Sequence, residues 1–225
     1  MENISQRLNK IRSKIDRAAR KSGRTLQDIT LVAVSKTVGP EAVMAAFQLG
    51  VTDFGENRVQ ELIRKSNLLP QARWHLIGRL QSNKVKDVVG KTCLIHSLDR
   101  WPLAEEINKR GAMLGIRVPA LVQVNITGEK SKTGLEPGDV LEFLQSAGQL
   151  PALQIMGLMT MAEEHPDPEA SRPVFRELAD LRSRMAGIRW ENVELRHLSM
   201  GMSQDYEVAV EEGADIVRIG SALFN

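Results

Sequence analysis

The sequence contains a single cysteine, Cys93, and this scarcity excludes an intramolecular disulfide. One unpaired cysteine is typical of proteins from a reducing compartment. The chain begins Met-Glu-Asn-Ile-Ser and shows no apolar segment of the kind found in signal peptides, and none of its apolar runs approaches the length of a membrane span. We therefore expect a cytoplasmic protein without a membrane segment.

An excess of charge of one sign is also missing. Lys and Arg total 30 against 28 for Asp and Glu, so the formal net charge is +2. Aromatic residues make up 4% of the chain, and the three tryptophans, Trp74, Trp101 and Trp190, lie far apart. Such a composition lacks the basic surface and the stacking platform that nucleic-acid binding requires. We expect no binding to nucleic acid.

Motifs for acyl hydrolysis or structural metal binding are absent. There is no Gly-x-Ser-x-Gly and no Cys-x-x-Cys. The histidines, His75, His96, His165 and His197, lack the helical spacing of metal ligands. Three of them fall on expected strands, which leaves a barrel-type metal site as an alternative. We predict instead that they are core or supporting residues and that no metal is bound.

The segment Gly128–Gly134 resembles a phosphate loop but does not fulfil the Walker A pattern. Five residues separate its glycines, and Leu135 follows where Lys-Ser/Thr is required. We expect a flexible basic loop at this place. Lys130 and Lys132 could still attract an anionic ligand.

Eight apolar runs typical of buried strands alternate with segments of helical periodicity. The expected strands are Leu31–Ser35, Thr52–Gly55, Trp74–Gly78, Cys93–Ser97, Ala120–Ile126, Leu153–Met161, Val193–Met200 and Asp215–Gly220. The expected helices between them are Pro40–Leu49, Arg58–Asn67, Asn83–Val89, Trp101–Leu114, Pro137–Ala147, Glu169–Met185 and Tyr206–Glu212. This alternation predicts a parallel sheet, and eight strands predict an α/β fold closed into a (β/α)8 TIM barrel. A doubly wound open sheet is the alternative.

An additional amphipathic helix is expected at residues 2–21. Its apolar residues Ile4, Leu8, Ile11 and Ile15 share one face, and lysines and arginines cover the others. The basic face could contact a membrane or an acidic partner, but we expect the apolar face to cap the barrel. We see no linker within residues 1–225, which predicts a single domain, and no exposed apolar helix face, which favours a monomer.

Polar residues at the C-terminal ends of the strands mark the candidate site, because barrel enzymes place their chemistry there. Lys36 directly follows the first strand. A lysine at the mouth of an apolar pocket loses solvation, and its neutral amine can form a Schiff base with an aldehyde. The alternative is that Lys36 is merely the first polar residue after a strand.

Small residues follow the last two strands, where barrels often bind phosphate. They form the clusters Ser199–Ser203 and Gly220-Ser221. Arg218 lies within the eighth strand, on the face of Ile216 and Gly220, and inside a barrel it needs an acceptor. That acceptor is either a carboxylate, such as Asp215 or Glu56, or a group of a ligand.

These segments together resemble the YggS/PROSC family of pyridoxal-phosphate-binding proteins, whose fold is similar to the N-terminal barrel of alanine racemase. The similarity extends over nearly the whole chain. It is carried by Ala33–Thr37, Phe54–Glu61, Trp74–Lys84, His96–Asp99, Val124–Ile126, Gly157–Met161, Leu198–Asp205 and Val217–Ser221.

The resemblance implies a set of cofactor-binding residues and no catalytic ones. Lys36 would hold pyridoxal 5′-phosphate as an internal aldimine, and Arg218 would face the pyridine nitrogen with Asn57 near the ring. The phosphate would be bound by Ser199, Gly220 and Ser221, with Met200 lending its backbone. The family usually continues beyond Ser-Ala-Leu-Phe, whereas this sequence ends at Asn225, which puts closure near the phosphate site in question.

The resemblance also implies a role in vitamin B6 homeostasis without robust catalysis. The recipients of the cofactor would be apo-enzymes that depend on pyridoxal 5′-phosphate (PLP). The alternatives are an amino-acid racemase and a cofactor-free Schiff-base aldolase. A two-base racemase needs a second acid/base opposite Lys36, which alanine racemase takes from an additional domain. The single tyrosine here, Tyr206, stands near the start of a helix, and we expect it to pack rather than to reach a ligand.

Overall fold

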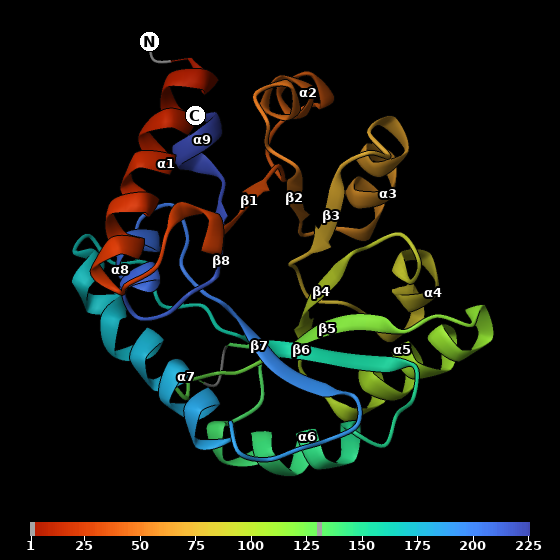
Figure 1. Ribbon diagram of the computed structural model, residues 1–225. Coiled ribbons are helices and arrows are strands. Elements are labelled where there is room, and N and C mark those ends of the chain that lie inside the picture. The colour runs from red at the N-terminus through yellow and green to blue at the C-terminus, as the bar shows by residue number, and fades with distance from the viewer. Residues whose placement is uncertain (1–2, 130–131) are drawn as a thin grey trace.

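The computed structural model describes residues 3–129 and 132–225, which form a closed barrel of eight parallel strands (Figure 1). Each strand pairs with the next in sequence, and β8 pairs with β1, with Leu31 opposite Val217. The strands are β1 Thr30–Val34, β2 Asp53–Glu56, β3 Arg73–Leu76, β4 Leu94–Leu98, β5 Val118–Gln123, β6 Leu153–Met159, β7 Val193–Ser199 and β8 Ile216–Ile219. The predicted TIM barrel is confirmed, and the β1–β8 pairing rules out the open sheet.

Helices form the outer layer and connect successive strands (Figure 1). They are α1 Ile4–Lys21, α2 Pro40–Gln48, α3 Val59–Leu68, α4 Val85–Val88, α5 Trp101–Leu114, α6 Val140–Ala147, α7 Arg172–Arg184, α8 Tyr206–Glu211 and α9 Ser221–Phe224. Short 3-10 turns precede α4, α6 and α7, at Ser82–Lys84, Pro137–Asp139 and Pro168–Ser171. The segment expected as one helix over Asn83–Val89 is therefore a 3-10 turn and a single α-turn.

Asp99 does not cap α5, contrary to what its position before the helix suggests. The N-cap residue is Arg100, which makes no side-chain capping bond. The Asp99 carboxylate instead pairs with Arg100 and lies 3.5 Å from Arg79 Nε. Two nearby guanidinium groups thus pair with this carboxylate in place of the backbone N–H groups of the first helical turn.

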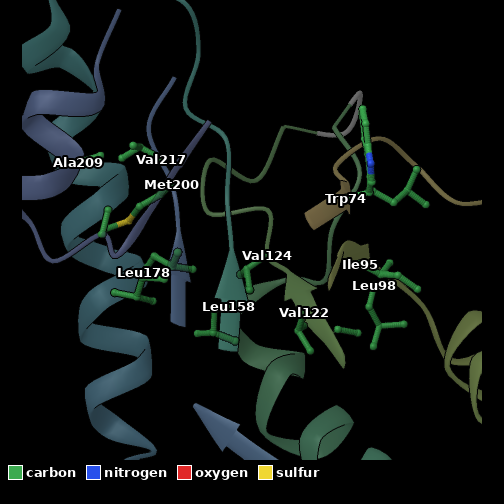
Figure 2. Packing of buried hydrophobic residues seen from close by; sticks show 14 of the residues in the cluster. Trp74, Ile95, Leu98, Val122, Val124, Leu158, Leu178, Met200, Ala209 and Val217 are labelled. Carbon is green, nitrogen blue, oxygen red and sulfur yellow. The ribbon is translucent and has the colours of Figure 1, made fainter. Parts of the chain in front are cut away.

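The core consists of two parts, because every strand of a closed barrel has an inner and an outer face. The larger part lies between the strands and the helices; Figure 2 shows some of it, including Leu158 of β6, Leu178 of α7 and Ala209 of α8. The smaller part fills the barrel interior with Val32, Leu94, Leu121, Met159 and Ile216. Polar residues occupy the rest of that interior, and they prove central to the site.

The apolar face of α1 is buried as expected, with Leu8, Ile11 and Ile15 in the outer core. The helix packs beside α8 and α9 (Figure 1). Its basic residues meet acidic groups of α8, in the ion pairs Lys14–Glu207 at 2.7 Å, Arg17–Glu207 at 2.8 Å and Lys21–Glu211 at 2.6 Å. Part of the basic face is thus paired within the chain. Of the helices in the described part of the chain, none has the length and apolarity to cross a membrane.

Candidate functional site

A cavity of about 550 Å³ opens at the C-terminal ends of the strands. This volume lies within the range of about 300–1,000 Å³ that is usual for small-molecule sites. Five of the seven predicted site residues line it, and they come from the loops after β1 and β2 and from β8 and its end: Lys36, Asn57, Arg218, Gly220 and Ser221. Apolar side chains complete the wall, among them Val34, Ile77 and Met161. The barrel therefore gathers residues that are up to 185 positions apart, from Lys36 to Ser221.

Lys36 is exposed, so the loss of solvation expected from its sequence context is not present in the protein alone. The backbone just before it is firmly held. The ammonium group of Lys65, on α3, donates to Ser35 O and to Glu56 Oε1, both at 2.7 Å, and the Ser35 hydroxyl also donates to Glu56 Oε1 at 2.7 Å. This buried group of three fixes the end of β1 and with it the starting point of the Lys36 side chain.

Arg218 is buried in the floor of the cavity. Its Nη1 donates to Ser199 Oγ at 2.6 Å and its Nη2 to Thr160 O at 2.9 Å. The expected carboxylate partners are engaged elsewhere, since Asp215 binds His197 and Glu56 binds Lys65. Burial lowers the pKa of Arg218 to about 10, which leaves the guanidinium charged at neutral pH. With five N–H donors available to it, the group presents a fixed positive donor to the cavity.

Ser199 and Met200 lie beneath the cavity rather than in its wall. Ser199 is fully buried, and its hydroxyl bonds His96 Nδ1 at 2.9 Å in addition to Arg218. The Met200 N–H donates to Ile216 O at 3.1 Å, and its side chain packs in the outer core (Figure 2). The alternation of β7 explains both positions, because it turns Ser199 into the barrel and Met200 toward the helices.

Ser203 lines the cavity, whereas Ser199, the serine of this cluster that was predicted to bind phosphate, does not. Its hydroxyl accepts from the N–H groups of Gly220 and Ala222, both at 3.2 Å. The Asp205 carboxylate holds this loop by accepting from Met202 N at 2.6 Å. Ser203 was part of the small-residue cluster in the sequence, but only the loop conformation shows which serine faces the cavity.

Gly78 allows the loops after β2 and β3 to approach each other at the cavity wall. A Cβ at this position would lie 2.2 Å from Asn57 O and 2.7 Å from Asn57 Cα. No side chain can be accommodated there without moving the Asn57 backbone. The position of Asn57 in the cavity therefore depends on the glycine.

Other candidate residues stay outside the cavity. Tyr206 packs in the outer core, as its position near the start of a helix suggested. Burial there raises the pKa of its hydroxyl to about 12. Lys132 lies 3.1 Å from Glu129 and 3.3 Å from Glu163, so acidic groups offset its charge. Lys130 is outside the described residues.

Asp53, His75 and Cys93 bring three potential metal ligands within 4.8 Å of one another. Two features oppose a cation at this place. Burial raises the pKa of the Cys93 thiol to about 11, and metals bind the thiolate. The Arg73 guanidinium also lies 3.1 Å from Asp53 Oδ1. The prediction of supporting rather than metal-binding histidines stays a prediction.

The comparison with known proteins agrees with this arrangement. The family model "Alanine racemase, N-terminal domain" matches residues 6–225. A pyridoxal phosphate homeostasis protein of Aquifex aeolicus is 46% identical over 224 residues, which cover 99% of this chain and 97% of the relative. The chain belongs to the pyridoxal phosphate homeostasis protein family. The resemblance to the YggS/PROSC family is thereby confirmed.

Solved structures extend the comparison. PipY of Synechococcus elongatus PCC7942, solved with PLP bound, is 34% identical and superposes with a TM-score of 0.84, covering 99% of this chain and all of PipY. Alanine racemase of Clostridium difficile 630 shares the fold at 16% identity, with a TM-score of 0.72. This chain covers 58% of that racemase.

Proposed function

We propose that this protein binds pyridoxal 5′-phosphate at the C-terminal end of its barrel and serves vitamin B6 homeostasis without robust catalysis. The observation that carries the proposal is one cavity lined by a lysine, a buried arginine and the small-residue turn after β8, namely Lys36, Arg218 and Gly220-Ser221. An aldehyde, a pyridine nitrogen and a phosphate are the groups that these residues match. The relatives' names and the PLP-bound structure of PipY support the same ligand.

Lys36 supplies the covalent link in this proposal. Its amine nitrogen adds to the aldehyde carbon, and loss of one water leaves a Schiff base. The exposed side chain has room to reach a ligand, while the buried pair of Lys65 and Glu56 keeps its backbone in place.

The phosphate is assigned to the turn after β8. The N–H groups of Gly220 and Ala222, which meet the Ser203 hydroxyl, are donors of the kind that bind phosphate oxygens. The Ser203 and Ser221 hydroxyls add further donors from the cavity wall. Ser199 acts through Arg218, and Met200 supports the loop by packing, so both contribute from beneath the cavity.

Arg218 explains why binding without strong catalysis is expected. A permanently charged guanidinium opposite the pyridine nitrogen keeps that nitrogen unprotonated, which makes the ring a weaker electron sink. We assign the contact with the ring to Asn57, which lines the cavity wall together with Gly78. Cofactor held in this way is suited to storage and to transfer to PLP-dependent apo-enzymes by a monomeric carrier.

The absorbance spectrum of the purified protein tests the proposal. We expect a yellow protein with the band of a Schiff base, which borohydride reduces and fixes to the peptide carrying Lys36. Lys36→Ala is the matched control and should show only the spectrum of free cofactor. A colourless wild-type protein that gains no band when PLP is added would refute the proposal.

A racemase-like activity is the second candidate, because the fold is shared with alanine racemase. The Tyr206 hydroxyl lies in the outer core, and among the described residues no other tyrosine is available as a second acid/base. We therefore expect negligible exchange of the α-hydrogen of amino acids with solvent deuterium. Rapid exchange that depends on Lys36 would favour the racemase instead.

A further inference from the structure

A continuous chain of hydrogen bonds crosses the barrel interior beneath the cavity. It begins at Asp53 Oδ1, which lies 2.9 Å from His75 Nε2. His75 Nδ1 is 2.9 Å from His96 Nε2, and His96 Nδ1 is 2.9 Å from Ser199 Oγ. Ser199 Oγ in turn accepts from Arg218 Nη1 at 2.6 Å. Five residues from five strands thus connect the start of β2 to the floor of the cavity.

The chain runs entirely through the protein interior. None of its members is more than 7% exposed, and the chain shares the barrel interior with the apolar residues of the inner core. In such surroundings a polar group without a partner is costly, so the inner members His75, His96 and Ser199 each depend on their two neighbours in the chain. Loss of one hydrogen bond is therefore expected to weaken or reorient the next hydrogen bond in the chain.

The two ends determine the direction of the hydrogen bonds. The Arg218 guanidinium has only donors, and an ionised Asp53 has only acceptors. Burial opposes ionisation of Asp53, but hydrogen bonds from His75 and Thr52 outweigh it and hold the pKa of the carboxyl below its ordinary value. Burial, the largest cause, lowers the pKa of His96 well below its ordinary value, so this ring is neutral and has a single N–H.

With one N–H on each histidine ring, only one arrangement of protons satisfies every link. Arg218 donates to Ser199 Oγ, and the Ser199 hydroxyl donates to His96 Nδ1. His96 Nε2–H donates to His75 Nδ1, and His75 Nε2–H donates to Asp53. Both histidines then carry their proton on Nε2, and the Ser199 hydroxyl is committed to His96, which leaves its lone pair to Arg218.

We propose that Asp53, His75 and His96 are positioning residues of the cofactor site, which act through Ser199 to hold Arg218 at the place where it meets the ring nitrogen. This inference rests on the proposed function. Asp53 itself is remote from the cofactor cavity, since it begins β2 and lines a separate cavity of about 250 Å³ at the other end of the strands. Its influence on the cofactor must therefore pass through the chain.

The proton arrangement is tested first, on the protein without cofactor, by nitrogen NMR of the histidine rings. We expect the neutral Nε2–H tautomer for His96 at neutral pH. A charged His96, or a proton on its Nδ1, would overturn the inference. This measurement does not require PLP binding, so it remains decisive even if the proposed function fails.

Two substitutions of His75 then separate hydrogen bonding from packing. The amide of His75→Gln can accept from His96 and donate to Asp53, whereas His75→Leu can do neither. We expect His75→Gln to keep the wild-type absorbance band and the wild-type rate of PLP release. His75→Leu should shift the band and release PLP about ten-fold faster or more, as befits a weakened hydrogen bond to a charged group. Equal behaviour of the two variants would overturn the proposal.

Asp53→Asn and Asp215→Asn form a matched pair of variants. Both remove the charge of an aspartate that binds a histidine, since Asp215 Oδ1 lies 2.9 Å from His197 Nδ1, but His197 is not part of the chain. We expect only Asp53→Asn to change the absorbance band and the rate of PLP release, while thermal unfolding reports the loss of stability in both. A wild-type band and release rate in folded Asp53→Asn would contradict the proposal, as would equal changes in both variants.

Discussion

The contribution of the buried ion pair of Lys65 and Glu56 to the free energy of unfolding can be measured by removing one partner. Lys65 is 2% exposed and Glu56 is 1% exposed, with their charged atoms 2.7 Å apart. The second carboxylate oxygen, Glu56 Oε2, is buried without a hydrogen-bond partner among the described residues. Lys65 thus compensates a carboxylate that has little other support, and we predict that Lys65→Met is strongly destabilising.

Two routes lead to a similar magnitude. Removing one partner of a buried ion pair typically costs about 3–5 kcal/mol, because it leaves an uncompensated charge. The variant can avoid that charge by protonating the carboxyl, but protonating a glutamate at pH 7 costs about 4 kcal/mol, from about 1.4 kcal/mol for each pH unit above its ordinary ionisation near 4.3. We therefore expect the free energy of unfolding to fall by about 3–4 kcal/mol at neutral pH.

Chemical unfolding followed by circular dichroism measures this loss, with Arg64→Met as the control. Arg64 lies on the same helix and pairs with Glu61 at 2.7 Å, but it is 51% exposed, so its loss should cost less than about 1 kcal/mol. The defect of Lys65→Met should shrink as the pH is lowered, since protonation removes the unpaired charge. Adding Glu56→Gln should restore part of the stability at neutral pH. A Lys65→Met variant as stable as Arg64→Met would refute the reasoning.

Three further predictions concern the cavity and the single thiol. Gly78→Ala places a Cβ 2.2 Å from Asn57 O, so we expect chemical unfolding to show about 1–3 kcal/mol of lost stability. Equilibrium dialysis should show weaker retention of PLP, and unchanged retention would contradict the role of Asn57. Ser203→Ala removes a hydroxyl that accepts from Gly220 N–H, so PLP should dissociate about ten-fold faster, measured by transfer to an apo-enzyme. Ser66→Ala, at a half-buried position of α3 that does not line the cavity, should leave this rate unchanged. Burial raises the pKa of Cys93 to about 11, so its thiol should react slowly with thiol reagents at neutral pH. The rate should rise about ten-fold per pH unit up to about pH 11, whereas a rate that is already constant above about pH 9 would indicate an ordinary thiol.

Local patterns were enough to predict the architecture. Apolar runs separated by helical periodicity depend on neighbouring residues, and their number and order imply a closed parallel barrel. Once a barrel is assumed, the ends of the strands become the candidate site, which explains why the sequence predicted Lys36, Gly220 and Ser221, all of which line the cavity. The weakest prediction was the region of α4, where a short connection folds as two different kinds of turn.

The partners of the polar residues, in contrast, were decided by the tertiary structure. Lys65 reads in the sequence like any lysine of a surface helix, but packing of α3 against β2 and β3 buries it on Glu56. For Arg218 the sequence left either a carboxylate or a ligand group as the acceptor, and within the chain it binds Ser199 and Thr160.

The same holds for the histidines and serines. His75 and His96 are 21 residues apart, and no sequence spacing indicates that their rings touch. The sequence determined which chemical groups stand at each strand, because periodicity is a local property. Which of them meet was settled by strand register and loop conformation, which bring together groups that are distant in the chain.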